Sequence, residues 1–239
     1  MDRNSILQAL QIGNISLQGQ FINSSNYTFL GKLEYQSINI PVVYKPVQGE
    51  RPLWDFPTGT LAKREVAAYV VSEALQWDLV PPTVFRSVEN LGEGSLQQFI
   101  NHDPKDHYFN FSQEERQRLR KVALFDAVIN NADRKASHIL RAEDNHIWLI
   151  DHGICFHPED KLRTVVWDFA GETVFQEDLE ALQSLLERKK LHPILNVKLR
   201  EYLSPAERKA LTNRTLHLLN NACFPVPSEE YRPYPWPPV

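Results

Sequence analysis

The stretch from Ala123 to Gly153 constrains the fold of this 239-residue chain more than any other part of its sequence. Apolar residues recur at helical spacing up to Asn130, and two short apolar runs on either side of Glu-Asp-Asn then have the pattern of a β-hairpin. Asp133 lies in the polar turn between helix and hairpin, and Asp151 follows the last apolar run. If the hairpin folds back, the two carboxylates meet although eighteen positions separate them.

The composition is ordinary for a soluble globular protein, with 42% hydrophobic and 23% charged residues. A net charge of −4 gives no basic field that would favour nucleic acid or stable association with an anionic membrane. The two cysteines, Cys155 and Cys223, lie far apart and favour a reducing compartment over a disulfide framework. The sequence has no signal-like start and no membrane-length apolar run, so we expect a cytoplasmic protein.

The first hundred residues have the patterns of a small antiparallel sheet. Apolar and polar residues alternate in short runs that are separated by polar or Gly- and Pro-containing turns, and one longer stretch has helical spacing. The sequence therefore predicts five strands, at 15–21, 28–35, 40–46, 83–88 and 95–100, and one helix, at 60–77.

The second half reads as mostly helical. Ser112 and Glu115 form a capping box before a helix that we expect to continue to Asn130. Three more helices are expected near 177–187, 193–202 and 205–221, and six prolines follow in an extended or disordered tail. We therefore predict an N-terminal lobe at 1–100, a helical lobe at 101–224 and a Pro-rich tail at 225–239.

Lys45 and Glu65 form a second pair of interest. Lys45 ends an apolar strand, and Glu65 lies at the edge of the apolar stripe of the next helix. A lysine in that place grips phosphates while a helix carboxylate fixes it, although either residue alone is more simply a solvated charge. The polar turn Ser24, Ser25 and Asn26 has two interpretations, a backbone cover for phosphates or a plain hairpin turn.

These features together suit phosphoryl transfer, which needs one carboxylate beside the attacking group and another on a metal. Their order also resembles a protein-kinase-like fold. Asn-Ala-Asp-Arg at 131–134 and Asp-His-Gly at 151–153 are similar to the phosphatidylinositol 3-/4-kinase superfamily, above all to type II phosphatidylinositol 4-kinases, and to bacterial HipA-type kinases. The whole chain looks closest to small bacterial phosphatidylinositol 3-/4-kinase-like proteins, from about residue 15 to residue 220.

The resemblance implies an α+β, two-lobed kinase-like fold that binds ATP with Mg²⁺ or Mn²⁺. It implies that Lys45 contacts the α- and β-phosphates and that Glu65 holds Lys45. It makes Asp133 the catalytic carboxylate, with Arg134 neutralising charge around the loop, and Asp151 a metal ligand. The remaining nucleotide contacts that it implies are Ser24, Ser25 and Asn26 over the phosphates and Gln97, Gln98 and Phe99 beside the adenine.

The sequence departs from the family pattern at one position of the site. Family members have an asparagine five residues after the catalytic aspartate, as a second metal-binding group, whereas this chain has His138. A neutral imidazole suits softer transition metals better than Mg²⁺. Three interpretations follow: a kinase with altered metal use, a weakened kinase, or a nucleotide-binding pseudokinase or sensor without turnover. His138 is alternatively a cap that bonds Asp133 or Asp151.

The acceptor and the reaction class have alternatives too. The chain has no basic amphipathic helix and no cysteine-rich segment, so a protein or small-molecule hydroxyl is expected as the acceptor rather than a phosphoinositide. A metal-dependent hydrolase is the less favoured reading, because it leaves Lys45 and Glu65 without a role. The residues of that mixed carboxylate–imidazole site are Asp133, His138, Asp151, His152 and His157.

Overall fold

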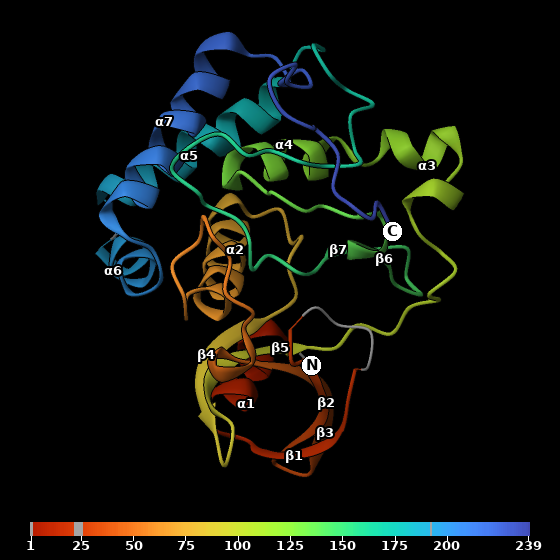
Figure 1. The fold of residues 1–239 in the computed structure, drawn as a ribbon, viewed down its shortest axis with the longest axis vertical. Helices are drawn as coiled ribbons and strands as arrows, with labels where there is room; N and C mark the ends of the chain where they lie inside the picture. The colour runs from red at the N-terminus through yellow and green to blue at the C-terminus, as the bar shows by residue number, and fades with distance from the viewer. Residues whose placement is uncertain (1, 22–25, 192) are drawn as a thin grey trace.

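The computed structural model describes residues 2–21, 26–191 and 193–239, and it places the strands at one end of the molecule and most helices at the other (Figure 1). The α+β class and the five antiparallel strands predicted from the sequence are confirmed in the described part of the chain. Each end has its own group of buried apolar side chains, and α2 (Leu61–Leu75) lies between them. The two ends therefore meet along one central helix.

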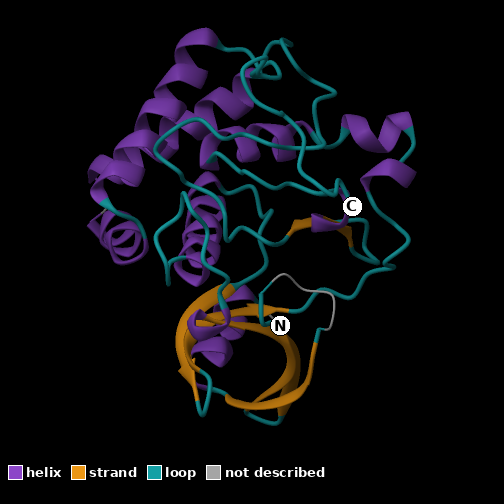
Figure 2. Cartoon of the chain, viewed as in Figure 1, coloured by secondary structure: helices purple, strands orange, loops and turns teal. Residues whose placement is uncertain are grey.

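The strands form one antiparallel sheet in the order β1-β2-β3-β5-β4, which curls around a helix (Figure 2). Side chains alternate between its faces, so Val42 and Tyr44 point into the apolar core of the sheet. Val43 and Lys45 therefore face the opposite side, toward the helical end. The strands are β1 (Asn14–Gln20), β2 (Phe29–Tyr35), β3 (Ile38–Pro46), β4 (Thr83–Val88) and β5 (Gly92–Gln98).

The helix inside the curled sheet, α1 (Arg3–Ile12), adds to the single helix that we predicted for this end. The Asp2 side chain caps it by accepting a hydrogen bond from the Ser5 backbone N–H at 3.0 Å. Its Leu10 is fully buried among apolar residues of the sheet, including Leu33. Asp2 before a short run of apolar residues was the available signal, but ten residues carry too few turns for the spacing to stand out.

The central helix α2 is buried on nearly every side, because the sheet covers one face and helices α5 (Gln176–Leu191) and α6 (Pro193–Tyr202) cover another. It ends at Gln76, whose left-handed φ of 59° lets its N–H bond back to the last turn. The apolar face that the sequence predicted is buried, and the opposite face of the helix is buried as well, so α2 is more enclosed than its spacing indicated. The burial extends to Glu65, which has only 3% of its surface exposed.

The helical end differs from the prediction in one respect, since the helix expected from Ser112 to Asn130 is broken near Leu119. The first piece has no buried residue and bonds to Arg141 through Glu115, whereas the second is almost wholly buried. The two pieces pack against different neighbours, which local spacing does not encode. The elements are α3 (Gln113–Gln117), α4 (Arg120–Ile129), β6 (Ile139–Arg141), β7 (Ile147–Leu149), α5 (Gln176–Leu191), α6 (Pro193–Tyr202) and α7 (Pro205–Asn221).

The Pro-rich segment 225–239 contains no helix or strand and lies on the helical end, with its last residues near β6 (Figure 1). Within the part of the chain that the structure describes, every helix is too short or too polar to traverse a lipid bilayer.

We expect Leu10→Ala to lower the free energy of unfolding by about 2–4 kcal/mol, because it leaves a cavity under the curled sheet. Ile12→Ala in the same helix is the matched control, since Ile12 is 62% exposed, and should change stability by less than about 1 kcal/mol. Urea unfolding of the two variants measures the difference. Equal effects would mean that α1 does not dock as described.

Candidate active site

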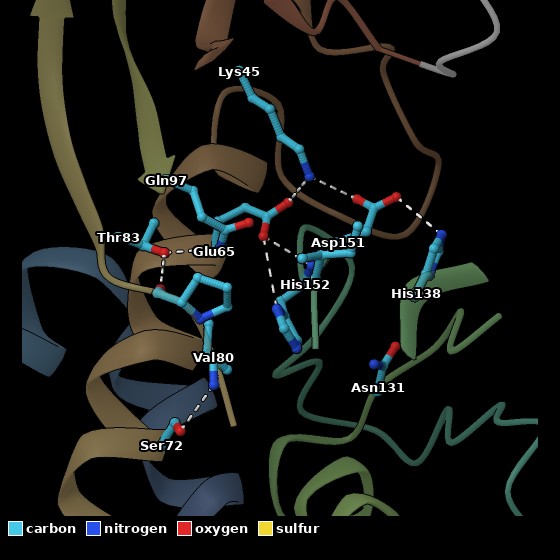
Figure 3. Close-up of polar contacts among 12 residues, drawn as sticks. Lys45, Glu65, Ser72, Val80, Thr83, Gln97, Asn131, His138, Asp151 and His152 are labelled. Carbon is cyan, nitrogen blue, oxygen red and sulfur yellow. Dashed lines mark hydrogen bonds and ion pairs between the residues drawn. The ribbon is translucent and has the colours of Figure 1, made fainter. Parts of the chain in front are cut away.

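Three charged side chains from distant parts of the chain meet where the sheet, α2 and the segment after β7 come together (Figure 3). Lys45 at the end of β3 forms an ion pair with Glu65 of α2, and its Nζ lies 3.0 Å from Oδ1 of Asp151. Burial alone lowers the pKa of Lys45, but the carboxylates of Asp151 and Glu65 more than compensate, so the net pKa is raised. A fully charged lysine is thus fixed between two carboxylates.

Glu65 also ties α2 to the backbone of the helical end. Its Oε2 accepts a hydrogen bond from the His152 N–H at 2.9 Å, while its other oxygen binds Lys45. Burial raises the pKa of Glu65, and the charge of Lys45 opposes that shift. The adjacent Asp151 has a left-handed φ of 62°, an unusual backbone conformation for an aspartate that the surrounding contacts maintain. The carboxylate of Asp151 is half exposed and its pKa is held well below its ordinary value by Lys45, against the effect of burial.

His138 contacts Asp151 from the opposite side, with its Nε2 3.3 Å from Oδ2 (Figure 3). Burial lowers the pKa of His138 to about 4, so the ring is neutral near pH 7. Its Nδ1 accepts from the Lys135 N–H at 3.4 Å, and we therefore assign the ring proton to Nε2. In this tautomer the protonated nitrogen faces the Asp151 carboxylate, the neighbour that the capping interpretation of the sequence named.

Asp133 lies in the turn that follows α4. Its N–H donates to Oδ1 of Asn131 at 2.9 Å, which shapes the turn, and its Oδ2 lies 3.6 Å from Nζ of Lys135. The pKa of Asp133 is raised to about 6, because burial and the charge of Asp151 outweigh the opposing charge of Lys135. The turn thus carries a carboxylate that is more basic than an ordinary aspartate.

Arg134 lies beneath this turn rather than in the cleft. Its side chain is fully buried and pairs with Asp126 of α4 at 3.0 Å. It also donates to the Ile150 carbonyl at 2.8 Å and bonds Nε2 of His152 at 2.8 Å. The guanidinium thus joins the turn to the segment that carries Asp151, and it holds the loop instead of facing a ligand. Asp126 was missed by the sequence reasoning, although an aspartate inside an apolar helix was the signal for it.

A cavity of about 450 Å³ opens beside these groups, between the sheet and the helical end. Its walls include Lys45, Asp151 and His138 together with apolar side chains that sequence reasoning did not single out, such as Val43, Leu140 and Ile150. A larger cavity of about 660 Å³ lies against α1, α2 and α6, but none of the three charged groups lines it. The chemistry of the walls therefore marks the smaller cavity as the candidate site.

The predicted adenine-side residues Gln97, Gln98 and Phe99 all line this cavity. Gln97 points its amide at the Thr83 hydroxyl, 2.8 Å away, and the N–H groups of Gln98 and Phe99 donate to backbone carbonyls of neighbouring strands. Of the predicted phosphate cover, Ser24 and Ser25 lie outside the described residues. Asn26 lies at a small adjoining pocket with Lys45, Glu65 and Asp151.

The side chains near Asp151 fit Mg²⁺ or Mn²⁺ only in a site that nucleotide phosphates complete. Among the residues that the structure describes, no three His, Cys, Asp or Glu side chains converge as a metal cage. His157 bonds the Asp55 carbonyl at 3.0 Å and His152 is buried against Arg134, so the hydrolase site of the sequence analysis is not assembled there. A Mg²⁺ held by one or two carboxylates and completed by nucleotide phosphates needs no such cage. Asp151, whose carboxylate is half exposed at the wall of the cavity, fits that kind of site.

Comparisons with known proteins agree with this geometry. The model of the phosphatidylinositol 3- and 4-kinase family matches residues 58–192. Protein Rv2133c of Mycobacterium tuberculosis is 37% identical over 94% of this chain and 92% of its own length. Phosphatidylinositol 4-kinase gamma 4 of Oryza sativa subsp. japonica is 30% identical over 46% of this chain, and phosphatidylinositol 4-kinase gamma 3 of Arabidopsis thaliana is 25% identical over 72%. The alignments span 22% and 30% of these two plant proteins.

A solved structure extends the similarity to the N-terminal residues that form the sheet. The proinflammatory kinase CtkA of Helicobacter pylori aligns with a TM-score of 0.53 over 89% of this chain and 93% of its own, at 14% sequence identity. This agreement in fold is important for Lys45, because the family model begins after β3 and does not include it. With a kinase-like fold and a family match over more than half of its length, the chain belongs to the phosphatidylinositol 3- and 4-kinase family.

Proposed function

We propose that this protein is an ATP-dependent phosphotransferase that moves the γ-phosphate of ATP to a hydroxyl of a protein or small molecule. The observation that carries the proposal is Lys45, fixed between Glu65 and Asp151 at the wall of a cavity large enough for a ligand. Phosphoryl transfer depends mainly on positioning and charge neutralisation, and a charged lysine held by a buried carboxylate supplies both.

The apolar walls and the charged end of the cavity suit the two parts of a nucleotide. Val43, Leu140 and Ile150 offer flat contacts for a base, while Lys45 offers a cation for the α- and β-phosphates. The N–H groups of Gln98 and Phe99 are already used in the fold, so a base edge would be met by other backbone groups of the connecting segment. Asn26, close to Lys45, is placed to approach the phosphates from the sheet side.

Asp151 would hold a Mg²⁺ or Mn²⁺ ion together with the nucleotide phosphates. When bound, the ion neutralises the charge of the phosphates. Nε2 of His138 lies 3.3 Å from Oδ2 of Asp151, so in this tautomer it would orient the carboxylate and would not itself be a ligand. We therefore favour a role for His138 in positioning, in place of the family's asparagine.

Asp133 would accept the proton of the attacking hydroxyl. Its pKa of about 6 leaves it ionised near pH 7 and basic enough for that transfer. The net charge of −4 supports a protein or small-molecule acceptor over an anionic lipid, although two of the relatives are named as phosphatidylinositol 4-kinases. The experiment below therefore tests protein acceptors and lipid acceptors separately.

Removal of either carboxylate should stop turnover. We expect Asp133→Asn to lower the release of ADP by about 10²–10⁴-fold, because it removes the base, while ATP still stabilises the folded protein against heat.

Lys45→Met should weaken ATP binding, and Lys32→Met is its matched control because Lys32 is an exposed lysine of the same sheet. Thermal shift with ATP and either Mg²⁺ or Mn²⁺, followed by ADP release with protein acceptors or phosphatidylinositol vesicles, measures these effects.

ATP binding without turnover in either metal would contradict the enzyme and favour a pseudokinase. Absence of ATP binding would contradict a nucleotide site altogether. Turnover with vesicles alone would replace the proposed acceptor by a lipid.

The shifted pKa of Asp133 gives a stability prediction. The folded state binds this proton more tightly than the unfolded state, so stability from this group falls as pH rises from about 4 to about 6. Asp133→Asn should therefore be more stable than the native protein at pH 8, by up to about 3 kcal/mol, with the difference vanishing below pH 4. Urea unfolding across this pH range tests it, and a constant difference would contradict the raised pKa.

A further inference from the structure

The Pro-rich segment 225–239 contacts the loop that carries the candidate catalytic residue. The Pro238 carbonyl accepts a hydrogen bond from the Ala136 N–H at 2.8 Å. The Pro233 carbonyl accepts from the Thr164 N–H at 3.1 Å and from the Trp167 indole at 3.2 Å. Figure 1 shows this segment passing from α7 across the helical end to β6.

Thr164 lies between the segment and the buried base of the loop. Residues 163–165 pair with Arg134, whose N–H donates to the Arg163 carbonyl at 3.0 Å and whose carbonyl accepts from Val165 at 3.1 Å. The Thr164 hydroxyl donates to Asp126 at 3.1 Å. The same short stretch is thus held by the loop on one side and by Pro233 on the other.

Ala136 connects the Pro-rich segment to His138 and, through His138, to Asp151. It is the first residue of the single turn 136–138, and the last residue of that turn is His138, which contacts Asp151. Ala136 also stands three positions after Asp133. The hydrogen bond from the Ala136 N–H to the Pro238 carbonyl therefore holds the stretch of chain between Asp133 and His138.

The sequence of the segment suits docking against the loop that carries Asp133. Prolines at 233, 235, 237 and 238 have no N–H to donate, and the segment contacts the residues around the loop through the carbonyls of Pro233 and Pro238. Their restricted φ angles also lower the entropy lost when the segment docks. Side chains add to the attachment, since Pro235 is buried and Nε of Arg163 donates to the Arg232 carbonyl at 3.3 Å.

We propose that residues 225–239 are a strap that positions the turn from Asp133 to His138 for phosphoryl transfer, an inference that rests on the proposed function. Without the strap, the Ala136 and Thr164 N–H groups lose their partners and the turn is free to shift. Displacement of a catalytic group by about 1 Å costs about 10²-fold in rate. The nucleotide cavity is lined by other elements for the most part, so its affinity should change little.

Two variants test the strap. The first ends at Phe224, with a peptide of residues 225–239 available to add in trans. The second, Ala136→Pro, removes the N–H that bonds Pro238 and adds a ring at a buried position; the preceding Lys135 is already extended (φ −86°, ψ 163°), as a residue before proline must be. Ala136→Gly keeps the N–H and is the matched control, and Tyr234→Ala alters a 45% exposed side chain within the strap.

Three quantities are measured: amide hydrogen exchange of the peptides around Ala136 and Thr164, the dissociation constant of ATP, and turnover. We expect truncation to speed exchange in both peptides and to lower turnover by at least about 10-fold, with ATP affinity within about 3-fold and partial rescue by the peptide. Ala136→Pro should lower turnover likewise, and both controls should stay within about 2-fold.

Higher turnover after truncation would overturn the strap and identify an autoinhibitory segment. An equal loss of ATP affinity and turnover would also overturn it, because that pattern indicates general destabilisation. Hydrogen exchange separates this inference from the proposed function: unchanged exchange contradicts the strap even in an active enzyme. A native protein that binds no ATP contradicts the proposed function whatever the exchange shows.

Discussion

The buried carboxylate of Glu65 is the constraint on which the arrangement of this molecule depends. A charge with 3% exposure costs several kcal/mol unless it is paired and hydrogen-bonded. Glu65 meets that cost with Lys45 on one oxygen and the His152 N–H on the other. These partners come from the sheet and from the segment after β7, so satisfying one charge brings both ends of the molecule against α2.

A second buried pair, Asp126 and Arg134, joins segments in the same way beneath the turn that carries Asp133. Arg134 reaches the backbone that carries Asp151, while Asp126 also accepts from Thr164. The two pairs hold Lys45 and the turn that carries Asp133 independently, and Asp151 lies beside Lys45. When the rate of a reaction depends on positioning, a partly exposed carboxylate such as Asp151 needs rigid contacts beneath it.

The sequence predicted regular elements well where local pattern and burial agree. The five strands and the last three helices lie close to their expected places because alternation and caps are local signals. The helix α1 was missed because it is short, and the break at Leu119 was missed because helical spacing continues across it. The candidate residues Lys45 and Glu65 were found from their neighbours. Asp126 was passed over although its partner Arg134 is only eight positions away, because helical spacing does not show that the two side chains are buried together.

The sequence by itself determined the order of elements, the family resemblance and the types of charged groups available, since these follow from residue identity and short-range spacing. Tertiary structure alone decided which of those groups share a cavity. It buried Arg134 under the loop, it turned His138 so that Nε2 faces Asp151, and it laid residues 225–239 against Ala136. Each outcome depends on contacts between residues far apart in the chain, where burial and pairing outweigh local preference.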